Sequence, residues 1–294
     1  MTTPPAEVAV TESMVASLVR AQHPTYAGPL RLAASGWDNA VFRLGSSWSV
    51  RLPRRAVAVP LLVNEQCWLP HLAALLPVPV PVPVAVGAPA GAYPWPWSIN
   101  PWLPGRPAGT VPVPRRAAFA ADLACCLAAL HVPAPPSAPG NAFRGVPLAS
   151  RAAAVRQRLD TLAAADRAGL HRVWSEALAA PPWTGPPVWL HADSHPANLL
   201  VGDDGRLAAL IDFGDLTAGD PATDLAAAWT VFDPPGRAAF RTALSALVPV
   251  DAATWRRARG WALSIGSAIA ASSADHPAMA AIGAHTLAQV LLPI

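Results

Sequence analysis

The sequence predicts an α+β fold in two parts, a small part rich in antiparallel β-strands followed by a larger, mainly helical part. Residues 30–55 alternate β-forming and polar residues and break at two Gly/Ser pairs, which favours three short antiparallel strands. Residues 114–131 and most of 222–292 instead repeat apolar residues at the three- and four-residue spacing of helices. Between the two patterns, the prolines of residues 77–96 exclude a helix and predict an extended connection.

The composition indicates a folded protein with no polyanionic partner. The chain has 294 residues, of which 53% are hydrophobic, and a formal net charge of only +3. That length is enough for two cores, and the composition is far from that of a disordered chain. All 21 basic residues are arginine, so any chemistry that commonly uses lysine must use arginine here. The paired arginines are scattered, and no stripe for binding nucleic acid is present.

The same composition favours a cytoplasmic protein without a membrane anchor. The uncharged stretch 72–105 is interrupted by prolines and cannot form a spanning helix. The N-terminus is polar and lacks the pattern of a signal peptide. The three cysteines, Cys67, Cys125 and Cys126, show no metal-binding spacing, which favours a reducing compartment.

The remaining elements follow from local patterns. A short helix is expected over residues 5–22 and a second helix over 59–76, in which Glu65 is the only carboxylate. Residues 97–105 resemble a strand that runs into a linker, so we expect the boundary between the two parts there. In the second part, helices are expected at about 150–161 and 165–179 and in three or four pieces after 222. GDDGRL at residues 202–207 predicts the turn of one central hairpin.

The stretch HADSHPAN, residues 191–198, concentrates polar groups in an otherwise apolar region and has three interpretations. Asp193 and Asn198 could cap the backbone of a structural turn. His191, Asp193 and His195 could bind a metal, although they alternate along the chain and no second histidine cluster would complete the site. The third interpretation is the catalytic loop of a phosphotransferase.

The spacing favours the phosphotransferase interpretation. Asp193 precedes Asn198 by five residues, and Asp212-Phe213-Gly214 follows fourteen residues after Asn198, beyond the expected hairpin. The catalytic loop and D-F-G segment of protein kinases have this order. Phosphoryl transfer needs a carboxylate that orients the acceptor hydroxyl and takes its proton, and oxygen ligands that hold Mg²⁺ against the nucleotide phosphates.

HADSHPAN, IDFGD and GDPATDLA together resemble the aminoglycoside phosphotransferase family of small-molecule kinases. SGWDNAVFRLG, VRLPRR, YPWPWSINPWLPG and GWALSIG resemble further segments of that family, so the similarity spans roughly residues 30–290. It implies a bilobal, protein-kinase-like fold. Residues 1–100 would form the nucleotide-binding lobe, 101–105 the hinge, and 106–294 a helical lobe with the catalytic loop and acceptor site.

The resemblance also implies roles for residues of the loop. Asp193 would be the catalytic base, and Asn198 and Asp212 would be the metal ligands. His191 would anchor the loop through hydrogen bonds and take no part in the reaction. Asp215 would assist the loop or the metal indirectly.

Two further expectations concern the shape of the loop. Asp220 would anchor the catalytic loop and Asp224 would act as a helix cap. Ala192 and Ala197 stand where the family has glycine, and alanine disfavours positive φ. The loop is therefore expected to use ordinary backbone angles at both alanines.

For the nucleotide, the resemblance points to five residues. Arg51 would replace the lysine of the family's third strand, with Glu65 as its partner. The hairpin at Ser35 would cover the nucleotide. Pro101 and Leu103 would meet the adenine, Pro101 with its carbonyl and Leu103 with its N–H.

The expected activity is ATP-dependent transfer of the γ-phosphoryl group to a hydroxyl of a small molecule, with ATP and Mg²⁺ as cofactors. The resemblance makes an aminoglycoside-type antibiotic the expected acceptor and antibiotic resistance the expected role. The second part has few acids but three tryptophans at helical positions, Trp229, Trp255 and Trp261, so a macrolide or another hydroxylated metabolite is an alternative. A nucleotide-binding pseudokinase is a further alternative. No nucleic acid, membrane or obligate protein partner is expected.

Overall fold

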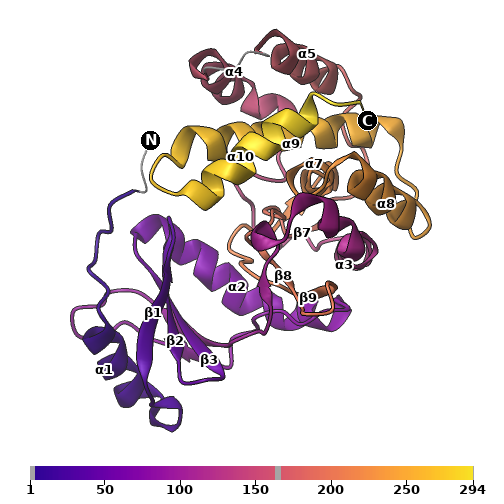
Figure 1. Cartoon of the computed structure of the whole chain (residues 1–294). Helices are drawn as coiled ribbons and strands as arrows, with labels where there is room; N and C mark the ends of the chain where they lie inside the picture. Colours follow the sequence, from indigo (N-terminus) through magenta and orange to yellow (C-terminus); the bar gives the residue numbers. More distant parts are fainter. Residues whose placement is uncertain (1–3, 163–166, 294) are drawn as a thin grey trace.

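A computed structural model describes residues 4–162 and 167–293 of the chain. Its N-terminal part is a five-stranded sheet with two helices, and its C-terminal part is a group of helices around two small sheets (Figure 1). The elements of the N-terminal part are α1 Glu12–Gln22, β1 Leu30–Ser35, β2 Asn39–Leu44, β3 Trp48–Pro53, α2 Val59–Leu72, β4 Ala85–Gly87 and β5 Trp97–Pro101. Helix α1 is shorter than the predicted 5–22 because Thr11 caps it, its hydroxyl accepting from the Met14 amide at 3.3 Å.

The sheet has the order β1-β2-β3-β5-β4, and all neighbouring strands are antiparallel. The three strands predicted for residues 30–55 are confirmed. In β2, alternate residues (Ala40, Phe42 and Leu44) are buried and join the core of the N-terminal part, as expected for a strand with one face on a core. Trp48 of β3 lies opposite Pro101 of β5, so the end of β5 and the strand carrying Arg51 are neighbours.

Helix α2 connects the sheet to the larger core. Leu69 and Leu72 in its last turns belong to the core of the C-terminal part, and the ring of Trp68 lies 5.0 Å from that of Trp189. Earlier in the helix, Glu65 is buried beside Arg51 of the sheet. Because one helix contributes to both packing regions, the sheet is held in a defined place above the helical part.

The C-terminal part holds strands β6 Arg106–Pro107, β7 Val188–Leu190, β8 Leu199–Val201, β9 Leu207–Leu210 and β10 Thr217–Gly219. Its helices are α3 Ala120–Leu130, α4 Ala152–Thr161, α5 Arg167–Leu178, α6 Ala222–Leu225, α7 Ala227–Thr230, α8 Pro234–Ser245, α9 Ala252–Ser272 and α10 Pro277–Val290. The predicted helix 114–131 begins as a 3₁₀ helix, Val113–Phe119, where prolines interrupt the α-helical hydrogen bonds. Residues 165 and 166 of the predicted helix 165–179 lie outside the described residues.

The two small sheets surround the polar segment. β8 and β9 form the predicted hairpin, whose Gly205 has φ of 77°. In addition to this hairpin, β7 pairs with β10, and β6 pairs with β8. The sequence prediction of a single central hairpin was therefore incomplete. Residues 191–198 run from β7 to β8, and the Asp212 segment runs from β9 to β10, so both polar segments connect the β7–β10 pair with the β8–β9 hairpin.

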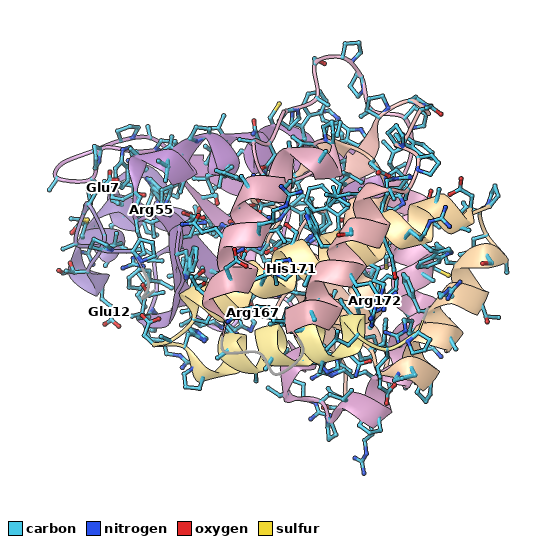
Figure 2. The ribbon with its side chains drawn as sticks, turned by 90° about the horizontal axis from the view of Figure 1, so that it is seen from above. Glu7, Glu12, Arg55, Arg167, His171 and Arg172 are labelled. Atoms are coloured by element: carbon cyan, nitrogen blue, oxygen red, sulfur yellow. The ribbon has the colours of Figure 1, made fainter. Side chains whose placement is uncertain are left out.

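The helical core occupies most of the C-terminal part. Seen from above, α4 and α5, the latter carrying His171 and Arg172, lie side by side and pack on α9 (Figure 2). Trp229 and Trp261 are fully buried in this core and Trp255 is 4% exposed. These tryptophans therefore fill the interior and offer no surface to an acceptor. Among the described residues, no helix is both long and apolar enough to cross a membrane.

Candidate active site

The carboxylate of Asp224 holds the start of the 191–198 loop. Its Oδ1 accepts a hydrogen bond from the amide of Ala192 at 2.6 Å, and its Oδ2 accepts from the amide of His191 at 2.9 Å. The Nε2 atom of His131 lies 3.1 Å from the same Oδ2. Asp224 is fully buried on α6, and these three contacts use it as the anchor of the loop.

The roles predicted for Asp220 and Asp224 are exchanged. Asp220 Oδ1 accepts from the Ala222 amide at 3.0 Å, as a cap of the next turn would. The same side chain forms a two-point ion pair with Arg257 of α9, at 2.6 Å from Nε and 3.2 Å from Nη2. The prediction failed because Asp220 immediately follows β10 and points towards α9, whereas Asp224 lies on α6 and points back at the loop.

Ala192 has φ of 67°, so the expectation of an ordinary backbone angle there was wrong. Left-handed geometry costs an L-residue about 1–2 kcal/mol. Two contacts offset this cost: the Asp224 bond to the Ala192 amide, and a bond from Arg144 Nε to the Ala192 carbonyl at 3.0 Å. Ala197 is not among the residues with positive φ, as predicted.

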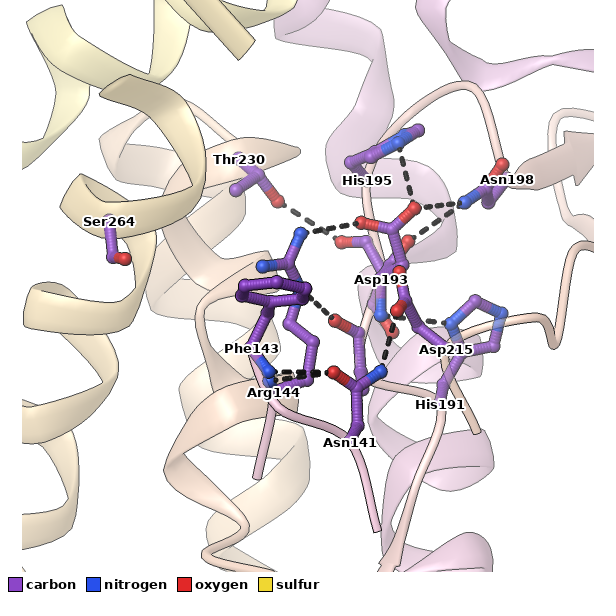
Figure 3. A network of polar contacts seen from close by, with 12 residues as sticks. Asn141, Phe143, Arg144, His191, Asp193, His195, Asn198, Asp215, Thr230 and Ser264 are labelled. Carbon is purple, nitrogen blue, oxygen red and sulfur yellow. Dashed lines mark hydrogen bonds and ion pairs between the residues drawn. The ribbon is translucent and has the colours of Figure 1, made fainter. Parts of the chain in front are cut away.

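Asp193 lies in the middle of a polar network (Figure 3). The side-chain amide of Asn198 donates to the backbone carbonyl and to the Oδ2 of Asp193, each at 3.0 Å. His195 Nε2 is 3.2 Å from Oδ2, and Arg144 Nη2 is 3.6 Å from Oδ1. Burial alone would raise the pKa of Asp193, but His195 and Arg144 outweigh it and hold the pKa well below its usual value. Asp193 is therefore an ionised carboxylate held in a fixed position.

The contact between Asp193 and His195 also shifts the pKa of His195, in the opposite direction. Burial would lower the pKa of His195, but the neighbouring Asp193 carboxylate raises it overall. His191 contacts the backbone on both sides of its ring. Its Nδ1 accepts a hydrogen bond from the Asp193 amide at 3.3 Å, and its Nε2 lies 3.0 Å from the Ile211 carbonyl. Its ring also packs on Phe213 at 4.5 Å. These contacts agree with the anchoring role predicted for His191.

Asn198 and Asp212 come together across the β8–β9 hairpin. The Ile211 amide donates to the Asn198 carbonyl at 3.0 Å, which places Asp212 directly beside this pair. Asp212 has φ of 61°, and its side chain is 48% exposed while Oδ1 lies 2.5 Å from Arg51. Burial would raise the pKa of Asp212, but Arg51 holds it below its usual value.

The oxygens of Asn198 and Asp212 fit a magnesium ion. Among the described residues, Asn198 Oδ1 and Asp212 Oδ2 accept no hydrogen bond and are free for a ligand. No group of three or more His, Cys, Asp or Glu side chains in the described ranges is placed to hold a metal. Two hard oxygen ligands, completed by phosphate oxygens and water, form the kind of site that Mg²⁺ uses beside a nucleotide.

Arg51 and Glu65 are neighbours, as their predicted pairing requires. Arg51 Nη2 lies 3.5 Å from Glu65 Oε2, and Arg51 also pairs with Asp212. Burial raises the pKa of Glu65 to about 7 even though Arg51 opposes this. The pKa of Arg51 is raised because its two carboxylate neighbours outweigh burial. The guanidinium therefore remains charged beside Asp212, the candidate metal ligand.

The other predicted nucleotide residues lie on the same sheet. Ser35 is exposed at the end of β1, and the turn after it is held by Arg55, whose Nε donates to the Trp37 carbonyl at 3.1 Å. Pro101 ends β5 beside the strand that carries Arg51. The N–H of Leu103 donates to no acceptor in the described part of the chain, so it is free for a ligand.

Sequence reasoning missed Asn141 and Arg144, which come from the loop between α3 and α4. Asn141 Nδ2 donates to Asp215 at 2.7 Å, while its Oδ1 accepts from the Arg144 amide at 3.1 Å. Arg144 then reaches the carbonyl of Ala192 and the carboxylate of Asp193. Burial raises the pKa of Asp215, although Arg144 and Asn141 oppose this. The only signal in the sequence was a pair of polar residues within an apolar, proline-rich loop.

The fold and the site define a class: a kinase-like fold in which an ionised aspartate lies between a cation, Arg144, and a candidate magnesium site. The chain belongs to the phosphotransferase enzyme family, whose model matches residues 29–261. It is therefore a small-molecule kinase. None of the curated proteins compared with the chain matches it.

Solved structures share the fold at low sequence identity. The GDP and kanamycin complex of APH(2")-IIia has a TM-score of 0.71 and 16% identity, over 94% of this chain and 97% of the other. The streptomycin-ATP-APH(2")-IIa ternary complex has a TM-score of 0.62 and 18% identity, over 87% of this chain and 90% of the other. The macrolide 2'-phosphotransferase MphH from Brachybacterium faecium has a TM-score of 0.60 and 23% identity, over 94% of this chain and 98% of the other. The match extends over nearly the whole chain and confirms the predicted bilobal fold.

Proposed function

We propose that this kinase transfers the γ-phosphoryl group of ATP to a hydroxyl of a small molecule, with Asp193 as the catalytic base. The observation that carries the proposal is the position of Asp193, ionised and fixed by Asn198, His195 and Arg144. Such a carboxylate can accept a hydrogen bond from the acceptor hydroxyl and orient its oxygen towards the phosphorus. It then takes the proton as the bond to phosphorus forms. A weak base is sufficient, because phosphoryl transfer depends mainly on positioning and charge stabilisation.

The nucleotide and its metal would bind between the two parts of the chain. Asn198 and Asp212 would hold Mg²⁺, which neutralises charge on the transferred phosphoryl group. Arg51, kept in place by Glu65, would contact the phosphates. Ser35 would cover them, and the backbone at Pro101 and Leu103 would hold the base. In this division, residues 1–100 bind the nucleotide, 101–105 are the hinge and 106–294 carry the acceptor site, within a cytoplasmic enzyme.

The acceptor side favours a molecule with few positive charges. Asp233 and Asp251 cap helices, accepting from Gly236 N at 3.0 Å and Thr254 N at 2.7 Å, so these acids are already engaged. A hydroxylated metabolite or a macrolide therefore fits better than a polycation. An aminoglycoside is the second candidate, because one structure with the same fold is a kanamycin complex. Phosphorylation of either antibiotic would give the enzyme a role in resistance.

The test is Mg²⁺-dependent release of ADP from ATP with a panel of aminoglycosides, macrolides, sugars and hydroxy acids. Release that requires both an acceptor and Mg²⁺ is expected. Replacing Asn198 or Asp212 by alanine should abolish the release of ADP that Mg²⁺ and the acceptor support. If the protein binds ATP and Mg²⁺ but no acceptor in the panel stimulates release beyond hydrolysis, the panel lacks the acceptor class. If it binds no nucleotide, the pseudokinase alternative replaces this proposal.

A further inference from the structure

Three arginines lie near one another beside Asp193, and we refer to them as the arginine cluster: Arg144, Arg151 and Arg158. Arg144 lies 3.6 Å from Asp193. The guanidinium of Arg151 stands over the ring of Phe143, 5.1 Å from its centroid. Arg158 of α4 donates to two groups of α9, the Ser267 hydroxyl at 3.1 Å and the Ser264 carbonyl at 3.2 Å. Figure 3 shows Arg144 and Phe143 next to Asp193, with Ser264 on the neighbouring helix.

The positive charge of this cluster is not balanced within the described residues. Only Arg144 has a carboxylate partner there. The Nε of Arg151 is buried and has no hydrogen-bond partner. Burial and the nearby Arg144 lower the pKa of Arg151, and burial with both neighbours lowers the pKa of Arg158 to about 10. Bringing partly buried cations together without a counter-charge costs free energy, so the arrangement is unfavourable in the free protein.

We propose that the arginine cluster binds an anionic group of the acceptor, a carboxylate or a phosphate or sulfate ester, while an acceptor hydroxyl lies at Asp193. This inference rests on the proposed function and names the acceptor class. The planar guanidinium forms two parallel hydrogen bonds to such oxyanions. Phe143, 59% exposed, offers an apolar surface to the carbon skeleton between the two groups.

The same charges act against a polycationic acceptor. A molecule with several ammonium groups would meet Arg144 at the position where its hydroxyl must approach Asp193. Like charges brought together at a binding site oppose binding. The arginine cluster therefore selects for anionic acceptors and against aminoglycosides.

Inorganic sulfate is the probe for the test. Its binding is measured calorimetrically at constant ionic strength with Mg²⁺ and saturating ADP present, so that the phosphate site near Arg51 is occupied. The wild type should bind sulfate saturably, and Arg151→Gln should weaken the affinity at least about tenfold, the loss expected for one charge-assisted contact. Arg156→Gln is the matched control, because Arg156 is an exposed arginine on α4, the helix that begins directly after Arg151.

Stability measurements keep the result interpretable. Arg151→Gln removes a partly buried cation that has no carboxylate partner among the described residues, and it should unfold at the same temperature as the wild type or higher. Arg151→Lys keeps the charge and should have intermediate affinity, which provides a second variant. The inference is overturned if the wild type does not bind sulfate, or if Arg151→Gln and Arg156→Gln bind it equally well. Binding of ADP and Asp193-dependent turnover of ATP, measured on the same samples, test the proposed function separately.

Discussion

Two residues of the active site, Ala192 and Asp212, hold left-handed backbone angles although neither is glycine. One precedes Asp193, and the other is a proposed metal ligand. Local strain of this kind persists only where surrounding contacts impose it, and it is common at functional sites. Here Asp224 and Arg144 impose it on Ala192, and Arg51 holds the side chain of Asp212.

Replacing Ala192 by glycine tests the strain at this position. Glycine tolerates positive φ, so Ala192→Gly should raise the free energy of unfolding by about 0.5–1 kcal/mol despite the greater freedom of the unfolded chain. Ala197→Gly, at an ordinary backbone angle, should lower it by a similar amount. Urea unfolding of both variants provides the comparison. Equal losses in the two variants would show that Ala192 carries no strain.

Glu65 should make stability depend on pH. Its pKa is raised from 4.5 to about 7 in the folded protein, so the folded state keeps a proton that the unfolded chain has already released. The free energy of unfolding contributed by this group therefore falls as pH rises through that window. Glu65→Gln lacks this titrating group, so its free energy of unfolding should not fall in that window. The difference in free energy of unfolding between the variant and the wild type should therefore increase between pH 5 and pH 8 by on the order of 2 kcal/mol.

Chemical denaturation at several pH values measures this difference. Glu176→Gln is the control, because the Glu176 side chain is 51% exposed. A difference between Glu65→Gln and wild type that stays constant with pH would contradict the shifted pKa.

At the scale of residues, the sequence alone indicated those candidate site residues that stand at a fixed spacing within one short segment. One loop and the hairpin after it carry Asp193, Asn198 and Asp212, so these three residues are close in the sequence and their spacing can be recognised there. Arg144 was missed because its contact with Ala192 spans 48 positions in the chain and leaves no local pattern. The backbone angle of Ala192 was predicted wrongly for the same reason, since its bond to Asp224 spans 32 positions.

At the scale of elements, α6 fixes the 191–198 loop. A four-residue helix has little stability of its own. Asp224 joins it to the end of β7 through hydrogen bonds to two backbone amides, and Asp220 joins its start to α9 through Arg257. The loop is therefore positioned by the C-terminal helices as well as by its own strands.

Removing the Asp224 carboxylate should be costly. Asp224→Ala leaves the buried amides of His191 and Ala192 without acceptors and should lower the free energy of unfolding by roughly 3–5 kcal/mol. Asp251→Ala, which removes only a helix cap, should cost about 1 kcal/mol. Thermal and urea unfolding distinguish the two. Equal effects would mean that Asp224 is an ordinary cap, as the sequence had suggested.

The longer elements followed from the sequence, and the shortest did not. The strands within residues 30–55 and the helices α2, α4 and α5 follow from periodicity. β7 and β10 have three residues each, too few for alternation to identify a strand. Their pairing depends on contacts between distant parts of the chain.

At the scale of the whole molecule, the Arg51 side chain adds a polar contact between the two parts to the apolar contacts of α2. Arg51 extends from β3 to Asp212 in the C-terminal part and is supported by Glu65 on α2. The nucleotide phosphates would lie at this junction. The guanidinium of Arg51 therefore contacts the helix and the candidate metal ligand Asp212 from the sheet, in a chain that has no lysine to serve instead.

Arg51→Met should raise the KM for ATP at least about tenfold, because a charge-assisted contact to the phosphates is lost. Arg31→Met, on the exposed side of β1, is the control and should leave KM unchanged. Steady-state kinetics with varied ATP measure both. An unchanged KM in Arg51→Met would remove Arg51 from the nucleotide site.

The most direct test of the central claim is the turnover number of Asp193→Asn, measured with its affinity for ATP in the presence of Mg²⁺. Asparagine keeps the size of the side chain but cannot take the proton of the acceptor hydroxyl. We predict a loss of turnover of about 100-fold or more, the usual contribution of a catalytic base, with ATP affinity close to that of the wild type. Turnover that is unchanged in Asp193→Asn would contradict the assignment of Asp193 and, with it, this account of the site.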